Sequence, residues 1–233
     1  MVKLAFVLAM MTPLLLTAQE TLRERPSSIQ VEGEAVVQAK PDRAEVDLGV
    51  VTQSPDAKTA AAQNAQKLDR VIQQLKSQVG QNLQIKTIGY SLNPNYVYPP
   101  QGGEPKITGY IATNIVQAQT DDLLQAGPII DTAIKAGANN VQALRFLLKD
   151  EEGVKAQALK EAATKARAKA DALAASLGVK VVKVLQVIEG GEPSVPMYTR
   201  QLSMESAKAD VSTPVEPGTL EVRAKVTLTV EIQ

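Results

Sequence analysis

The order of periodic segments between residues 44 and 148 restricts the fold of this chain more than any other feature. Apolar and polar residues alternate near 44–50, 83–92, 107–119 and 141–148, which predicts strands. Helical periodicity occupies the intervals 57–79 and 121–136. The order is thus strand, helix, strand, strand, helix, strand. With right-handed crossovers it predicts a ferredoxin-like βαββαβ unit with both helices on one side of an antiparallel sheet.

Further periodic segments flank this unit. Residues 29–37 predict a strand that ends at Lys40-Pro41-Asp42, and a hairpin with the strand at 44–50 is the natural interpretation. Towards the C-terminus, the longest helix is expected over 150–177, a strand over 179–189, a Pro-containing excursion over 190–218 and a closing strand over 220–232. These segments either extend the first sheet or form a second lobe. The predicted fold class is α+β.

Polar residues mark the ends of these elements. Ser54-Pro55-Asp56 predicts a helix start, with Ser54 as the N-cap, and Gly80 predicts the end of that helix. Asp121-Asp122 favours a helix cap over a cation site, with Asp121 as the capping residue. Asp150-Glu151-Glu152 opens the longest helix, where acidic residues suit the helix dipole. Lys40-Pro41-Asp42-Arg43 is interpreted as a turn capped by its own Asp rather than as a site.

Two surfaces are predicted from side-chain size and charge. The first strand of the unit has one solvated face, which carries Glu45, Asp47 and Gly49. One face of the longest helix carries mostly alanine, which lets it lie very close to a sheet or another helix. That face consists of Val154, Ala158, Ala162, Ala166, Ala170, Leu173 and Leu177. The opposite face carries Lys160, Lys165 and Lys169 together with acidic residues, and such a mixture of charges predicts a face in contact with solvent. The alternative is that the three lysines contact an anionic lipid or glycan.

The N-terminal segment has the pattern of a secretory signal. Lys3 precedes an apolar run from Leu4 to Leu16, and small residues follow, so that cleavage is predicted after Ala18. The alternative is an uncleaved anchor, although the run is shorter than the roughly 20 residues of a membrane span. Residues 19–28 then form a flexible lead. We expect a protein of the periplasm or cell envelope, without a stable membrane span after cleavage.

Composition narrows the chemistry that this chain could perform. It contains no His and no Cys, which excludes Ser-His-Asp triads, thiol nucleophiles, imidazole and thiolate metal sites, and disulfides. The 25 basic and 25 acidic residues lack the basic excess of a nucleic-acid binder. No glycine-rich phosphate loop opens a helix. We therefore expect no enzyme, no cofactor, no metal and no nucleic-acid partner.

Two tyrosine-bearing segments are the candidate interaction sites. Residues 93–103 predict a loop that is longer than a hairpin requires, with Tyr96 and Tyr98 on a Pro-stiffened backbone. Aromatic anchors on a stiff loop suit partner recognition. The alternative is that both rings fold back as a lid on the sheet. The later excursion repeats the theme with Tyr198 and Arg200.

Six segments, taken in order, resemble one family. They are VEGEAVVQAKPDRAEVDLGV around Gly33, IKTIGYSLNPNYVYP, ITGYIATN, AGANNVQALRF, ALKEAATKARAKADALAASLG and EPGTLEVRAKVTLTVEI. Together they are similar to the SIMPL domain family, of the periplasmic oxidative stress defence protein and periplasmic immunogenic protein type, a domain of unknown function. The likeness spans about residues 29 to 232. It implies an exported protein with two α/β lobes, with some members similar to subunits of ring-like assemblies, and it supplies no catalytic residues.

The leading hypothesis is a non-enzymatic, exported protein that assembles with itself and has a role in stress protection. Its expected organisation is a signal peptide over 1–18 and a SIMPL-type domain over 29–233. Within that domain, 44–148 form the βαββαβ unit and 149–233 supply the long helix and two strands. The rival hypothesis is a binding protein for a small ligand or an envelope polymer, using a cleft between the lobes and the two tyrosine segments.

Overall fold

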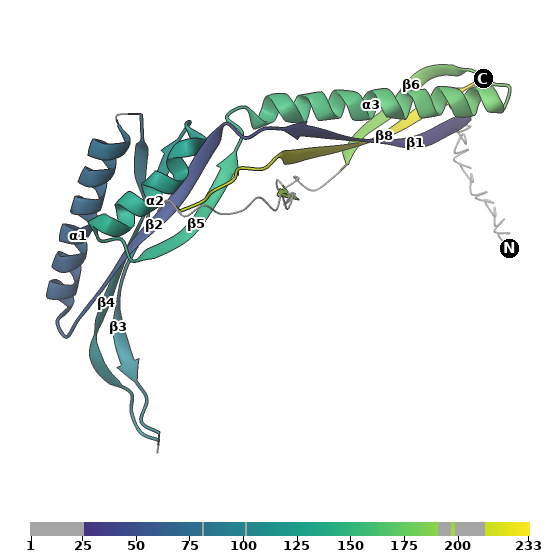
Figure 1. The fold of residues 1–233 in the computed structure, drawn as a ribbon. Helices are drawn as coiled ribbons and strands as arrows, with labels where there is room; N and C mark the ends of the chain where they lie inside the picture. Colours follow the sequence, from purple (N-terminus) through teal and green to yellow (C-terminus); the bar gives the residue numbers. More distant parts are fainter. Residues whose placement is uncertain (1–25, 81, 101, 191–196, 199–212) are drawn as a thin grey trace, which may run out of the picture.

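The computed structural model describes residues 26–80, 82–100, 102–190, 197–198 and 213–233 (Figure 1). The elements are β1 (Ser28–Ala39), β2 (Arg43–Ser54), α1 (Ala57–Val79), β3 (Gln84–Val97), β4 (Lys106–Thr120), η1 (Leu123–Gln125), α2 (Ala126–Ala136), β5 (Asn140–Leu147), α3 (Glu151–Ser176), β6 (Val181–Gly190), β7 (Met197–Tyr198) and β8 (Leu220–Ile232). The predicted α+β class is confirmed. The predicted signal peptide lies outside the described residues.

The strands form two antiparallel sheets. Sheet I has the strand order β3-β4-β2-β5 and sheet II the order β1-β8-β6, with β7 beside the start of β8. Sheet I contains β2-α1-β3-β4-α2-β5 in the predicted order of elements. Figure 1 shows sheet II and α3 extending away from sheet I, so the additional helix and strands form a second lobe and do not lengthen the first sheet.

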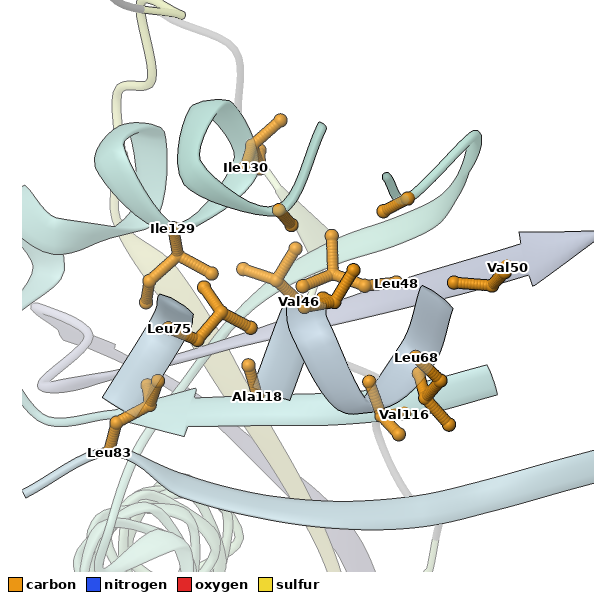
Figure 2. Packing of buried hydrophobic residues seen from close by; sticks show 13 residues of the cluster. Val46, Leu48, Val50, Leu68, Leu75, Leu83, Val116, Ala118, Ile129 and Ile130 are labelled. Carbon is orange, nitrogen blue, oxygen red and sulfur yellow. The ribbon is translucent and has the colours of Figure 1, made fainter. Parts of the chain in front are cut away.

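The main core lies between sheet I and the helices α1 and α2. Alternate residues of β2 point to these helices, as the period of two requires. Figure 2 shows Leu75 of α1 and Ile129 of α2 converging on Val46 of β2. The buried members of the cluster are Val46, Leu48, Val50, Leu68, Val71, Leu75, Leu83, Val116, Ala118, Ile129, Ile130, Ala133 and Ala138. The hydrophobic members of this core are therefore all aliphatic, and Asn64 of α1 is buried beside them, where it donates to the carbonyls of Val50 and Ala112.

The alanine face of α3 packs on β1 and β8 of sheet II. Its buried residues are Ala158, Ala162, Ala166, Ala170 and Ala174. The predicted end of this face is wrong, because Leu173 and Leu177 are exposed and Ala174 is buried in their place. Repeated steps of four residues from Ala158 along the helix reach Ala174 and not Leu173 or Leu177. The approach is close at Gly33, where a Cβ would lie 2.5 Å from the backbone nitrogen of Ala166.

The predicted hairpin between residues 29–37 and 44–50 is wrong. β1 pairs with β8, whereas β2 pairs with β4 and β5, so the chain passes from sheet II into sheet I through residues 40–42 (Figure 1). There the backbone nitrogen of Asp42 donates to the carbonyl of Leu147 at 3.0 Å. The Oδ1 of Asp42 accepts from the backbone nitrogen of Lys149 at 2.7 Å. Asp42 therefore fastens this crossing to the β5–α3 connection and does not cap its own turn.

The N-cap of α1 lies two residues later than the sequence predicts. Asp56 is the N-cap, because its carboxylate accepts from the backbone nitrogen of Thr59 at 2.8 Å. Ser54 is the last residue of β2, and its hydroxyl accepts from the backbone nitrogen of Asp56 at 3.3 Å. At α3 the prediction holds, since Asp150 caps the helix by accepting from Gly153. Both caps satisfy donors that the first helical turn leaves unpaired.

The cap before α2 is Asp122, not the predicted Asp121. The carboxylate of Asp122 accepts from the backbone nitrogen of Leu124 at 3.1 Å and starts the turn η1. Asp121 instead contacts Arg43 and Lys149. The two adjacent carboxylates thus have separate structural roles, one local and one between distant segments.

The chain returns from the excursion along the side of α2. Thr213 donates to the carboxylate of Asp131 from its backbone nitrogen at 3.2 Å and from its hydroxyl at 2.7 Å. Val215 then packs against a small cluster that includes Ala126 and Phe146. The crossing that leads to β8 is therefore held against sheet I before the strand enters sheet II.

Candidate interaction surface

β6 presents an apolar edge that no described segment covers. It lies at the margin of sheet II and, within the described chain, its ladder partner is β8. Helix α3 lies mainly over β1 and β8 and barely reaches β6. Large apolar side chains on this strand are between 40% and 59% exposed: Val182, Val184, Leu185, Val187 and Ile188. We refer to these five side chains as the β6 edge.

The β6 edge is apolar on both faces of the sheet. The ladder to β8 shifts register twice, which places extra residues of β6 against β8. Val184 and Val187 pair with Val230 and Leu228, which are buried on the α3 face. Ile188 pairs with the neighbour of Leu228 and therefore points to the opposite face. The exposed surface thus wraps around the margin of the sheet.

The other margin of sheet II, β1, carries charged side chains and an occupied backbone carbonyl. The Nζ of Lys169 donates to the backbone carbonyl of Glu32 at 2.8 Å. The Nζ of Lys225 lies 2.7 Å from the carboxylate of Glu32 and 3.7 Å from that of Glu34. The hydrogen bond from Lys225 to Glu32 raises the pKa of Lys225, and the negative charge of Glu32 makes the second largest contribution. Charged side chains on an edge strand disfavour pairing with another strand, so the apolar margin β6 is better suited to a contact than β1.

Two shallow grooves run along β1 beside α3. One has a volume of about 620 Å³ and is lined by Val31, Glu32, Lys169, Ala172 and Leu173. The second, of about 450 Å³, shares Glu32 and Lys169 and adds Glu34, Lys165 and Ala168. Lys160 lines neither groove, so the structure separates it from the other two lysines that the sequence grouped together.

The predicted loop at 93–103 is partly strand. β3 continues to Val97 and pairs with β4 beyond the end of β2, which forms a two-stranded arm away from the helices (Figure 1). Tyr96 pairs with Ile107, and Tyr98 follows the last strand residue. The two tyrosines are 45% and 72% exposed, so neither ring is buried as a lid. Both remain candidate contact residues near the tip of the arm.

The structure places the tyrosines in different sheets. Tyr198 belongs to β7 and pairs with Leu220 at the start of β8 in sheet II. Tyr96 and Tyr98 belong to the arm of sheet I. Arg200 lies outside the described residues. The predicted tyrosine sites are therefore two separate features and not one binding surface.

An ionic network crosses the face of sheet I opposite to α1 and α2. The Nη2 of Arg145 lies 2.7 Å from Asp47 and 3.7 Å from Glu45. The Nε2 of Gln117 donates to Asp47 at 3.1 Å. The prediction of a solvated face is therefore wrong for Asp47, whose side chain is 8% exposed because its neighbours on β4 and β5 lie across it. The alternation of polar and apolar residues along β2 predicts which face carries Glu45 and Asp47, but it does not predict the contacts of Asp47 with Arg145 and Gln117.

Asp121 links three segments near the crossing of the chain from sheet II into sheet I. Its carboxylate lies 3.2 Å from the Nε of Arg43 and 3.0 Å from the Nζ of Lys149. The hydrogen bond from Lys149 lowers the pKa of Asp121, and the bond from Arg43 adds to this against the opposing effect of desolvation. The ionised carboxylate therefore connects the start of β2, the end of β4 and the β5–α3 connection.

Replacing Asp121 by Asn should lower the urea midpoint at neutral pH and have no effect in acid. A lowered folded-state pKa means that the ion pairs stabilise the protein above the ordinary value of 3.8 and are lost as the pH falls through the folded value. Urea titrations across acidic pH measure this. Asp69→Asn is the control, because Asp69 contacts Gln73 on its own helix. A midpoint difference that persists in acid would contradict the assignment.

Two further properties of the described ranges concern membrane spans and metal sites. None of the helices there is long and apolar enough to cross a bilayer. The same ranges contain no group of three or more acidic side chains that could hold a metal ion.

A family model described as SIMPL, protein of unknown function (DUF541), matches residues 29–230. The chain belongs to the SIMPL family. The match begins in β1 and ends in β8, so the family pattern includes both sheets. The resemblance that the sequence shows is thereby confirmed.

Two relatives within the SIMPL family illustrate its range. The 26 kDa periplasmic immunogenic protein of Brucella melitensis biotype 1 is 30% identical over 223 residues, which cover 93% of this chain and 89% of the relative. The uncharacterized protein YggE of Escherichia coli K12 is 25% identical over 208 residues, with 88% and 83% coverage. The first name places a SIMPL relative in the periplasm, and neither name states an activity.

Proposed function

We propose that this SIMPL protein is exported to the periplasm or cell envelope, assembles there with copies of itself, and contributes to stress protection without enzymatic activity. The β6 edge is the observation that carries the proposal. Uncovered edge strands are templates for pairing with another chain, and contiguous exposed apolar surface marks interaction sites. The five apolar side chains of β6, a strand that no described segment covers, meet both descriptions.

Export is supported from two directions. The first 18 residues carry the secretory pattern described above, and a relative that aligns over 93% of the chain is named a periplasmic protein. An exported SIMPL protein without Cys forms no disulfides, so its assembly depends on noncovalent contacts.

The absence of enzymatic activity is supported by the chemistry of the side chains. The whole sequence lacks His and Cys. The most buried carboxylate of the ionic network, Asp47, has one oxygen bonded to Gln117 and the other to Arg145. A carboxylate held in this way has a structural role, whereas a general acid or base needs access to the proton that it transfers. We propose no cofactor and no nucleic-acid partner.

Self-assembly is tested by the mass of the mature protein. We expect analytical ultracentrifugation at micromolar concentration to give a multiple of the monomer mass, because the β6 edge is buried in the assembly. A monomer under these conditions would contradict the proposal.

The arm provides a second test of how the protein assembles. Changing Tyr96 and Tyr98 together to Ser should lower the assembled mass, since aromatic side chains supply much of the contact energy at interfaces. Light scattering measures the mass, and circular dichroism verifies the fold. Tyr90→Ser is the matched control, because Tyr90 is an exposed tyrosine of the same strand, nearer the body of sheet I. An unchanged mass in a folded double variant would remove the arm from the interface.

The grooves beside α3 favour one alternative function, the binding of a small ligand or envelope polymer. The larger groove combines apolar walls with Lys169 and Glu32. Thermal-shift measurements with peptidoglycan fragments and with lipopolysaccharide would distinguish this function, because a specific ligand raises the melting temperature by mass action. A shift that is lost in Lys169→Ala would place the ligand in this groove.

A further inference from the structure

We infer that the two grooves beside α3 form one site for a single-chain amphiphile with an anionic headgroup, such as a fatty acid. The acyl chain lies in the larger groove, and the headgroup meets Lys165 in the smaller one. This inference rests on the alternative function proposed above, the binding of a small ligand, and names the chemical class of that ligand. It does not depend on self-assembly.

The two grooves are continuous along one face of α3. Glu32 and Lys169 line both of them. The residues that α3 contributes are spaced by three and four positions: Lys165, Ala168, Lys169, Ala172 and Leu173. Residues at these spacings are neighbours on one helix face. Because residues 165–173 span about 12 Å along the helix axis, one elongated ligand can contact both grooves.

The larger groove has an apolar end. Val31 of β1 and Leu173 of α3 line it together with Ala172, whose side chain is a single methyl group. Leu173 is 46% exposed, so that an acyl chain covering it would remove apolar surface from water. The volume of about 620 Å³ lies within the range of pockets that hold small ligands.

The smaller groove has an excess of positive charge. Both of its carboxylates are near Lys225, since Glu32 lies 2.7 Å and Glu34 3.7 Å from its Nζ. Lys169 donates to the backbone carbonyl of Glu32, a contact that leaves its positive charge in place. Lys165 is exposed and has no ion-pair partner within the described part of the chain. Three lysines therefore face two carboxylates, and the complementary ligand carries a negative charge.

The other charged residues of this part of α3 do not line the grooves. Arg167 and Asp171 pair with each other at 3.0 Å. Glu161, one turn before Lys165, accepts from Gln157 at 3.1 Å. These contacts leave Lys165 as the lysine that is free to meet the headgroup.

An anionic lipid fits this site better than a glycan does. Sugar hydroxyls need hydrogen-bonding partners, and the side chains of Val31, Ala172 and Leu173 at the apolar end supply none. An amphiphile covers these side chains with its chain and bonds to a lysine with its head, and such a charge-assisted bond is stronger than a neutral one. Lys160 lines neither groove and takes no part.

Isothermal titration calorimetry with laurate, below the concentration at which it forms micelles, tests the inference. We expect laurate to bind. Dodecyl maltoside has the same chain with an uncharged head, and acetate has the head without the chain. Each should bind about ten-fold more weakly than laurate, because each lacks one half of the contact. A failure of laurate to bind, or equal binding of laurate and dodecyl maltoside, would overturn the inference.

Two matched pairs of variants locate the ligand. Lys165→Ala should weaken laurate binding about ten-fold, the usual effect of losing one hydrogen bond to a charged group, whereas Lys160→Ala should not. Leu173→Asn should also weaken it, whereas Leu177→Asn should not, because Leu177 is an exposed leucine of α3 that lines neither groove. Circular dichroism verifies the fold. Equal effects within either pair would overturn the site.

The outcomes separate this inference from the alternative function. If peptidoglycan fragments raise the melting temperature of the wild type but not of Lys169→Ala, and laurate does not bind, the groove binds a polymer and the inference is overturned. If laurate binds and Lys165→Ala weakens the binding, the inference stands, even where no polymer changes the melting temperature.

Discussion

Gly33→Ala is expected to destabilise the protein by about 3 kcal/mol, at the upper end of the usual cost of overpacking. A Cβ at this position overlaps the backbone oxygen of Ala162 and lies 2.5 Å from the backbone nitrogen of Ala166. The obstacle is helix backbone, which cannot rotate away as a side chain can. Helix α3 would have to lift from β1, which would open its contact with sheet II.

Urea unfolding followed by circular dichroism measures this effect. A loss of about 3 kcal/mol corresponds to a melting temperature lower by roughly 6–12 °C for a chain of this size. Gly190→Ala is the matched control, because Gly190 also lies in a strand of sheet II and a Cβ there meets its nearest neighbour, a side-chain atom of Lys225, at 3.7 Å. The control should change stability by less than about 0.5 kcal/mol. Equal stabilities would contradict the close approach of α3.

Asp47→Ala is expected to cost about 2 kcal/mol. Removing one partner of a fully buried ion pair costs more, about 3 to 5 kcal/mol, but here Arg145 is 37% exposed and solvent compensates part of the loss. The amide of Gln117 also loses its acceptor, and Gln117 is buried. Both losses affect the pairing of β2 with β4 and β5.

The comparison for Asp47 is an exposed ion pair with similar geometry. Arg167 and Asp171 lie 3.0 Å apart on α3, with both side chains about half exposed. Asp171→Ala should therefore cost less than about 0.5 kcal/mol. Thermal unfolding of the two variants measures the difference. If both cost the same, the packing of β4 and β5 across Asp47 does not isolate this ion pair from solvent.

Local patterns predict the elements of this fold well and their ends less well. The strands at 44–50 and 107–119, and the helix at 57–79, occur where period and polarity place them. Errors of a few residues arise where two neighbouring polar residues compete for one role, as Ser54 and Asp56 do at the start of α1. Only the geometry of the strand end decides which side chain reaches the helix donors.

The candidate surfaces were harder to derive from the sequence. The tyrosines of the arm stand out in the sequence because they lie on a Pro-stiffened segment that is longer than a hairpin requires. The sequence does not indicate the β6 edge, because a segment rich in valine and leucine is typical of a buried strand. Its exposure depends on where α3 lies, and the helix covers β1 and β8 instead.

By itself, the sequence determined the element types and the alanine face of the longest helix, because these depend on residues close together in the chain. It also determined the α+β class and membership of the SIMPL family, because these depend on the order of segments along the chain. The tertiary structure decided that β1 pairs with β8 and not with β2, that Asp47 is buried and that no described segment covers β6. These features depend on pairings between distant residues, such as Ser28 with Glu231. The alternation of polar and apolar residues defines the face of a strand but carries no information on which strand lies beside it.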